Sequence, residues 1–260
     1  MSKKRAAIIG MGRLGSSLYL LLEQLGYQVE TEIDHLSTLP DIIFITTPDD
    51  AISEVATKLA QELSIVFKAR RETVVLHCSG AMSSKELAPL SILGFATGSL
   101  HPLKSFTRAI SSTSELEGVY WCFEGHLIAE KLAEQLVKKS RGRFVKVDSQ
   151  MKPVYHAAAV MACGHLVALL DLSISMMVEC GIERGQAIDM LLPLVVGTIE
   201  NVKGRKESEL FSQVLTGPFA RGDFGTVQQH IKALMNLQKD YISIYSLLGH
   251  HSLQIAKKRD

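Results

Sequence analysis

The 260-residue sequence is poor in aromatic residues and in cysteine, and it carries almost no excess of charge. Aromatic side chains make up 6% and the net charge is +1, so we expect neither a stacking surface nor a positive field for nucleic acid. The four cysteines lie in apolar segments without C-x-x-C spacing, which predicts reduced thiols in a cytoplasmic protein. A disulfide framework and a metal site are therefore not expected.

Long uninterrupted apolar runs are also missing. The longest apolar stretch, residues 157–178, is interrupted by His165, Asp171 and serines, so we interpret it as a helix buried inside protein rather than a membrane span. The basic residues 1–5 precede an apolar run that ends at Gly10, which is too short for a signal peptide. No membrane partner is expected.

A glycine-rich turn near the start of the chain is the most informative feature present. Residues 6–9 favour a buried strand and residues 16–25 form an apolar run of helix length. The spacing G-x-G-x-x-G between them predicts a turn whose backbone can approach a pyrophosphate at the helix N-terminus. The alternative is a glycine-rich turn without a ligand. The residues assigned here to cofactor binding are Gly10, Met11, Gly12, Arg13, Leu14 and Gly15.

Strand and helix patterns alternate as far as residue 148. This alternation predicts an α/β fold, a Rossmann-type and mostly parallel sheet. Further strands are expected at residues 27–33, 41–47, 73–78, 94–100, 119–123 and 143–147, and helices at residues 51–63, 84–90 and 126–139.

Asp34 follows the second expected strand, where an acid binds ribose hydroxyls and a basic residue accommodates a 2′-phosphate. Asp34 favours NAD over NADP, although His35 could serve a phosphate and Glu30 is a competing acid. Residues 35–40 are too few for the usual crossover helix before the third strand. The adenosine side of the cofactor site would then lose one wall.

Side chains after the later strands are expected to line the cofactor groove, because ligands of open α/β sheets bind at the carboxyl ends of strands. His101 ends a strand and can donate to a substrate near the nicotinamide, although a simple loop histidine is the alternative. His77 lies inside an apolar strand and is interpreted as structural. Asp49 or Asp50 can cap the next helix. The groove residues are Thr46, Thr47, Pro48 and Ser79.

From residue 149 onward the sequence is helical. We predict a dinucleotide-binding domain at residues 1–148 and an all-α domain for dimerisation and substrate binding at residues 149–260. Helices that are apolar on most faces need burial beyond one layer, which favours a homodimer. The expected helices cover residues 153–180, 183–203, 226–237 and 239–255.

Lys152 and His156 stand four residues apart at the start of the first of these helices, so they share a face. Next to the reactive end of a cofactor, an ammonium and an imidazole could supply or orient a proton. Tyr155 is expected to point elsewhere. The alternative is a basic residue near a helix start together with a capping or interface histidine.

A turn-rich segment at residues 215–223 interrupts the helices. Thr216 and Arg221 within it could hold an anionic group of a substrate. Asp223 has an alternative role as the cap of the next helix.

Four stretches together resemble a known family. They are residues 10–15, Leu100-His-Pro-Leu103, Lys152-Pro-Val-Tyr-His-Ala-Ala-Ala159 and residues 215–223. They are similar to the Rossmann-like proteins with C-terminal domain of unknown function 2520, and more distantly to pyrroline-5-carboxylate reductases and β-hydroxyacid dehydrogenases. The resemblance covers nearly the whole chain. It implies an NAD(P) site in the first domain, a dimer through the second, and a lysine with a polar partner one helical turn on.

These features predict a cytoplasmic, homodimeric NAD(P)-dependent oxidoreductase. Hydride would pass to or from a small carbonyl, hydroxy or imine substrate, with Lys152 or His156 handling the proton and His101 near the nicotinamide. The rival hypothesis is a non-catalytic sensor that keeps the reductase fold to bind a nucleotide or metabolite. A structural dimerisation module would explain the helices but not the glycine turn.

Overall fold

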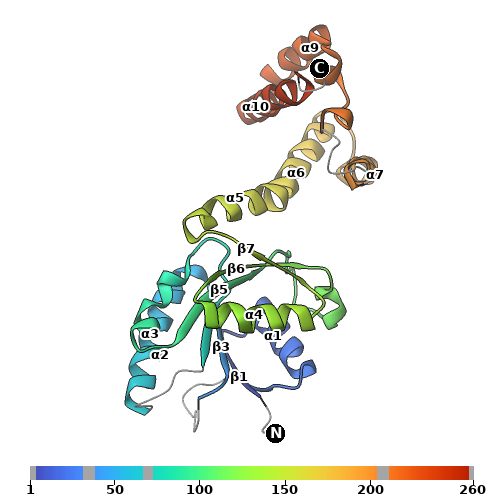
Figure 1. Cartoon of the computed structure of the whole chain (residues 1–260). Helices are drawn as coiled ribbons and strands as arrows, with labels where there is room; N and C mark the ends of the chain where they lie inside the picture. The colour runs from blue at the N-terminus through green and yellow to red at the C-terminus, as the bar shows by residue number, and fades with distance from the viewer. Residues whose placement is uncertain (1–3, 32–38, 67–72, 204–210, 258–260) are drawn as a thin grey trace. The chain divides into compact units, whose positions relative to one another are not determined.

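The computed structural model describes residues 4–31, 39–66, 73–203 and 211–257. The chain divides into two compact units between Gly164 and His165. The first unit combines a sheet with helices on both of its faces, and the second is helical (Figure 1). The predicted Rossmann-type sheet followed by a helical C-terminal region is confirmed.

One sheet of seven strands runs through the described part of the first unit, in the order β2-β1-β3-β4-β5-β6-β7. Neighbouring strands are parallel except for β5 and β6, which are antiparallel. The strands are β1 (Arg5–Ile9), β2 (Gln28–Glu30), β3 (Ile42–Ile45), β4 (Val74–His77), β5 (Ala96–Pro102), β6 (Tyr120–Gly125) and β7 (Arg143–Lys146).

The strand order changes direction at β1, because β2 lies on one side of it and β3 on the other. Ligands of open α/β sheets bind at such a switch point, beyond the carboxyl ends of the strands. The register places Ile9 beside Ile45, Ile45 beside His77 and His77 beside Ser99. The carboxyl ends of β1, β3 and β4 therefore share one edge of the sheet, where β5 continues to Pro102.

Residues 32–38 are outside the described residues. The predicted ribose contact of Asp34, the possible phosphate contact of His35 and most of the short crossover fall there. The competing acid, Glu30, forms an ion pair with Arg5 at 2.6 Å, so its carboxylate already has a partner.

Helices cover both faces of the sheet. The helices α1 (Arg13–Gln24) and α4 (Leu127–Lys139) pack on one face, and α2 (Ile52–Val66), η2 (Ser84–Leu87) and α3 (Ala88–Ile92) pack on the other (Figure 1). Side chains alternate along each strand, so Ile42 and Phe44 join one core while Ile43 and Ile45 join the other. All four are fully buried, as expected for a strand covered on both faces. A 3₁₀ turn, η3 (Thr113–Leu116), precedes β6.

The last helix of the first unit, α5 (Lys152–Ala162), follows a 3₁₀ turn, η4 (Ser149–Met151). The sequence changes from strands to helices at residue 148, where the domain boundary was predicted. The compact units divide 16 residues later, at Gly164. The side chain of Lys152 is buried within the first unit, so α5 continues that unit rather than beginning the next one.

The second unit contains α6 (Gly164–Glu179), α7 (Arg184–Lys203), η5 (Phe211–Gln213), α8 (Pro218–Arg221), α9 (Phe224–Met235) and α10 (Lys239–Ala256) within its described residues. A small core of Ile174, Ala187 and Leu191 joins α6 to α7. The carboxylate of Asp223 accepts a hydrogen bond from the Thr226 amide at 3.1 Å and thereby caps α9. The capping role considered for Asp223 is confirmed.

The apolar stretch around residues 157–178 differs from its expectation. The segment Ser149–Glu179 is long and apolar enough to span a membrane by length and composition, and only 6% of its most apolar window is buried. Its helices α5 and α6 are separated at Cys163, and side chains such as Val167 are exposed. The described part of this chain alone therefore does not bury the segment, and its burial inside protein stays a prediction that depends on the expected homodimer. Its apolar side chains, which the chain itself leaves exposed, remain available for contact with another molecule.

Candidate functional site

The glycine turn between β1 and α1 is shaped by two close backbone contacts. Gly10 has a φ of +100°, a conformation that side chains strongly disfavour. A Cβ on Gly15 would lie 2.1 Å from the carbonyl oxygen of Gly10, so helix and strand could not approach this closely with any other residue. These positions serve the turn and the packing, as the glycine pattern predicts.

Gly12 is different, because a Cβ built on it would have no described atom within 4 Å. Gly12 is the exposed N-cap of α1, and the first amides of a helix have no partner inside the helix. The described first turn of α1 contains no acidic residue that could neutralise this end. The open space, the free N–H groups and the positive end of the helix dipole fit a diphosphate.

The end of β3 packs directly against this turn. The hydroxyl of Thr46 donates to the carbonyl oxygen of Gly10 at 2.5 Å. A Cβ on Gly10 would lie 2.8 Å from the Thr47 amide nitrogen, and the buried Thr47 hydroxyl has no partner among the described residues. Pro48 then begins the turn η1 (Asp49–Ala51). The structure therefore places Thr46, Thr47 and Pro48 together with the turn, with Met11, Arg13 and Leu14 along it.

The hydroxyl of Ser79, just beyond β4, is already used within the chain. It donates to Asp49 at 2.7 Å and accepts from the Met82 amide at 2.9 Å. Neither Asp49 nor Asp50 caps the following helix through a side-chain hydrogen bond, contrary to expectation, because Asp49 bonds Ser79 instead. The cofactor contact assigned to Ser79 stays a prediction.

Lys152 reaches from the start of α5 into the edge of the sheet. Its side chain is 1% exposed, and Nζ donates to the carbonyl oxygen of Ser79 at 2.8 Å and to the hydroxyl of Ser99. Burial lowers the pKa of this ammonium, an effect that the negative charge of Glu124 partly opposes. The ammonium is thus enclosed between the segment after β4 and the middle of β5.

His77 is held as a neutral imidazole. Its Nδ1 accepts from the Ser79 amide at 3.2 Å, and its Nε2–H donates to the carbonyl oxygen of Ser83 at 3.1 Å. Burial and the charge of Lys152 lower its pKa to about 4. Both ring nitrogens are therefore engaged, which agrees with the structural role expected for His77.

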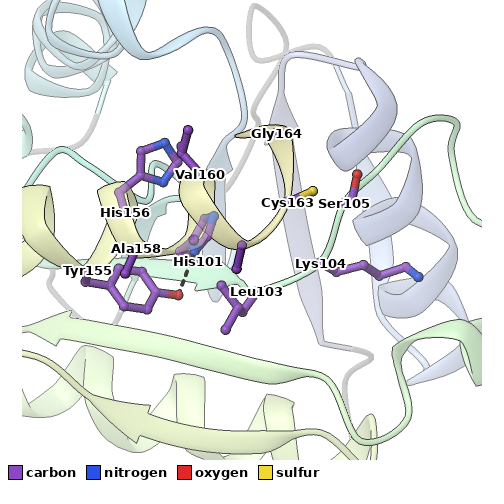
Figure 2. Close-up of a pocket in the computed structure, with 12 residues that line it drawn as sticks. His101, Leu103, Lys104, Ser105, Tyr155, His156, Ala158, Val160, Cys163 and Gly164 are labelled. Carbon is purple, nitrogen blue, oxygen red and sulfur yellow. Dashed lines mark hydrogen bonds between the residues drawn. The ribbon is translucent and has the colours of Figure 1, made fainter. Parts of the chain in front are cut away.

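His101 lies in β5 itself and meets α5 through Tyr155. Its Nδ1 is 2.9 Å from the Tyr155 hydroxyl, and the two rings pack edge to face at 5.7 Å (Figure 2). Burial, followed by the charges of His156 and Lys152, lowers the pKa of His101 to about 4. Burial raises the pKa of Tyr155, so the phenol keeps its proton at neutral pH.

The expectation that Tyr155 points elsewhere is wrong. Three residues advance a helix by about 300°, so Tyr155 lies only about 60° around the helix from Lys152. Its hydroxyl consequently reaches His101, the very group that was predicted to act on the substrate.

His156 is the third side chain of a cluster that also contains His101 and Tyr155. Its ring packs edge to face on His101 at 5.8 Å, and its buried Nδ1 has no partner among the described residues. A Cβ on Gly80 would lie 2.4 Å from this Nδ1 and 3.0 Å from Nε2 of His101. Both imidazoles therefore converge on the backbone of Gly80, and only glycine leaves room for them. Gly80 and Ser99 gave no signal of this in the sequence, because their contacts depend on strand pairing.

A pocket of about 540 Å³ opens beside these rings, within the first unit (Figure 2). One wall is the apolar face of α5, and the other is the start of the segment after β5. The predicted contacts of Thr216 and Arg221 belong to the second unit and stay predictions. The pocket is lined by His101, Leu103, Lys104, Ser105, Tyr155, His156, Ala158, Ala159, Val160, Ala162, Cys163 and Gly164.

Comparison with known proteins gives one family match and several similar solved structures. The family described as "Domain of unknown function (DUF2520)" matches residues 119–252. No curated protein matches the sequence at a significant level. The protein TM1727 from Thermotoga maritima has a similar structure, with 22% identity, coverage of 98% of this chain and 99% of that chain, and a TM-score of 0.74.

Two further solved structures are nicotinamide-dependent reductases. The pyrroline carboxylate reductase of Plasmodium falciparum, solved with NADP bound, shares 14% identity at a TM-score of 0.58 and covers 98% of this chain and 99% of that chain. The reductive aminase of Aspergillus terreus, solved with NADPH and ethyl levulinate, shares 10% identity at a TM-score of 0.62 and covers 98% of each chain. At these identities the likeness shows a shared fold, that of NAD(P) oxidoreductases.

Proposed function

Because the chain belongs to the DUF2520 family and has the fold of NAD(P) oxidoreductases, we propose that it transfers a hydride between a nicotinamide dinucleotide and a small carbonyl, hydroxy or imine substrate. The observation that carries this proposal is the open helix terminus at Gly12. It lies at the same edge of the sheet as the cluster of His101, Tyr155 and His156. Two to three strand spacings, about 10–14 Å, separate β1 from β4 and β5, which suits a ligand that extends along this edge.

The residues present fit a dinucleotide. The turn from Gly10 to Gly15 would hold the diphosphate through main-chain amides, and residues 46–48 would line the groove beyond it. Asp34 would bind the ribose, which favours NAD over NADP in this proposal. When bound in its reduced form, the cofactor supplies a hydride, that is, two electrons with one proton.

The chain's own residues handle the other proton. As the substrate carbon gains hydride, its oxygen or nitrogen gains a proton, and the imidazoles of His101 and His156 are the proton-carrying groups proposed here among the residues that line the pocket. His101 can give a proton at Nε2 while Nδ1 takes one from the phenol of Tyr155, and a proton from solvent then restores the phenol. His156 offers a second imidazole nitrogen that no described residue engages.

The role that we propose for Lys152 differs from that of the two imidazoles. Because its ammonium is enclosed by Ser79 and Ser99, we propose that it holds the segment after β4 against the middle of β5. Its charge also holds His101 in the neutral form. The catalytic role predicted for Lys152 would then be exerted through its neighbours rather than by contact with the substrate.

The apolar side chains exposed on α6 and α7 support the proposal of a homodimer joined through the C-terminal helices. Examples are Val167, Leu194 and Val196. Large apolar patches of this kind mark association surfaces in soluble proteins. A cytoplasmic location is part of the same proposal.

Titration with NADH and with NADPH, followed by nicotinamide fluorescence, tests the cofactor site. We expect binding of at least one of them below millimolar concentration. Gly12→Val should abolish it while the protein stays folded, with a loss of stability of about 1 kcal/mol at the helix cap, because the new side chain occupies open space that the diphosphate would need. Gly197→Val is the matched control, since a Cβ on Gly197 of α7 likewise meets no described atom within 4 Å.

The outcomes separate the hypotheses. Absence of binding of both dinucleotides at millimolar concentration would contradict the proposed function. Equal binding by wild type and Gly12→Val would place the diphosphate elsewhere. Tight binding without turnover of any carbonyl, hydroxy or imine compound would favour the non-catalytic sensor.

A further inference from the structure

The pocket beside His101 offers little fixed charge to a ligand. Among the described residues that line it there is no carboxylate, and the only side chain with a permanent charge is Lys104. The Lys104 ammonium lies over the ring of Phe106, 5.9 Å from its centroid. Figure 2 shows this side chain extending away from His101 and Tyr155, so mainly its alkyl stem faces the cavity.

Two polar groups deeper in the pocket, His101 and Tyr155, are also neutral. Burial and neighbouring positive charge keep the pKa of His101 near 4, and the Tyr155 phenol is protonated. These groups can donate and accept hydrogen bonds, which suits a carbonyl oxygen or an imine nitrogen. They do not neutralise a carboxylate, and a buried anion without a partner is strongly disfavoured.

The remaining wall is apolar. Ala158, Ala159, Val160 and Ala162 of α5 face Leu103 across the cavity. At about 540 Å³ the cavity has the volume of a typical small-molecule site, with a few polar groups at one end and hydrocarbon along the rest.

We propose that this pocket takes an uncharged, mainly apolar carbonyl compound, or the imine formed from it, rather than a keto acid or an imino acid. The inference rests on the proposed function. In the reduction the carbonyl carbon gains a hydride from the reduced nicotinamide, the π pair of the C=O bond moves to oxygen, and oxygen gains a proton from Nε2 of His101, which solvent replaces through Tyr155.

A matched pair of probes tests the proposal. Methyl hexyl ketone and the α-keto acid with the same hexyl chain differ only in a methyl group against a carboxylate. Calorimetric titration of the full-length protein, with and without a saturating oxidised dinucleotide (NAD or NADP, whichever binds), compares the two affinities, because the ketone cannot be reduced in that complex. We expect the ketone to bind at least tenfold more tightly. Equal or tighter binding of the keto acid, or binding of neither probe, would overturn the proposal.

Variants locate the effect in this pocket. Ala158 lines the pocket and is exposed, so Ala158→Arg should fold and should raise keto acid affinity at least tenfold. The neighbouring Ala157 is exposed but does not line the pocket, and Ala157→Arg is the matched control. Lys104→Met should leave the preference for the ketone unchanged, because the Lys104 ammonium lies over the ring of Phe106. A loss of keto acid binding in this variant would show instead that the ammonium binds the carboxylate, and would contradict the proposal.

Failure of this inference is distinguishable from failure of the proposed function. Ketone binding that does not require a dinucleotide, in a protein that binds neither NAD(H) nor NADP(H), would refute the oxidoreductase and leave the pocket chemistry intact. Binding of either dinucleotide together with a preference for the keto acid would support the oxidoreductase and refute the uncharged substrate. Keto acid binding that Arg221→Ala abolishes would instead support the predicted anion contact of Arg221.

Discussion

Replacement of His77 by asparagine should flatten the acid dependence of stability in the first unit. The imidazole of His77 is fully buried and engaged at both nitrogens, and its pKa is lowered from 6.5 to about 4. Protonation would turn Nδ1 into a donor facing the amide of Ser79 and would place a second positive charge near Lys152. The folded protein therefore resists a proton that the unfolded chain accepts.

The sign and size of the effect on stability follow from the difference between the His77 pKa in the folded and unfolded states. Between pH 6.5 and pH 4 the unfolded state binds more protons at this residue, so stability falls as the pH falls. At ~1.36 kcal/mol per pKa unit, this shift corresponds to about 3 kcal/mol in the free energy of unfolding. Most of this stability is lost by pH 4. His77→Asn removes this loss. At pH 7.5 the variant should be about 1–2 kcal/mol less stable, because the bond to Ser83 is lost and the side chain is smaller.

Trp121 provides the assay, since it is the chain's single tryptophan and is fully buried in the sheet. Its fluorescence in urea reports unfolding of the first unit at each pH. The free-energy difference between wild type and variant should shrink and then change sign between pH 6.5 and pH 4. A difference that stays constant over this range would refute the reasoning, as would an NMR titration giving the His77 ring an ordinary pKa.

Three further predictions concern the site. Gly15→Ala should destabilise the first unit by about 3 kcal/mol in urea unfolding, because its Cβ would press on the backbone oxygen of Gly10, and an unchanged midpoint would contradict this packing. Tyr155→Phe should lower kcat about a hundredfold with little change in KM, and a pure KM effect would remove the phenol from the proton path. Lys152→Met should raise the pKa of His101 by removing a nearby cation, which an NMR titration of the ring protons measures; a fall would exclude that cause.

The sequence could predict those parts of the fold that depend on neighbouring residues. The turn from Gly10 to Gly15 was predictable because strand, glycines and helix are contiguous, and the packing at Gly15 agrees with the pattern. The position of β3 beside β1 was not, because strand order depends on contacts between distant segments. The edge-to-face packing of His101 and His156 depends on the same order, and their proximity could be predicted only as a hypothesis.

The burial of individual side chains was also beyond what the sequence could predict. The spacing of Lys152 and His156 correctly placed both on one side of a helix, but it could not say that the lysine is enclosed by Ser79 and Ser99. Tyr155 was within reach of sequence reasoning, because a spacing of three residues also keeps side chains on one side. The roles of Asp34 and Arg221 stay predictions.

The anchoring of Lys152 has a practical consequence for dissecting the protein. A fragment that stops at residue 148, where the strand pattern ends, would discard the amine that ties the Ser79 loop to Ser99 and would uncover that polar interior to water. A fragment that continues to Gly164 would retain it. The shorter piece should therefore be the less soluble of the two, even though it contains every strand that the structure describes.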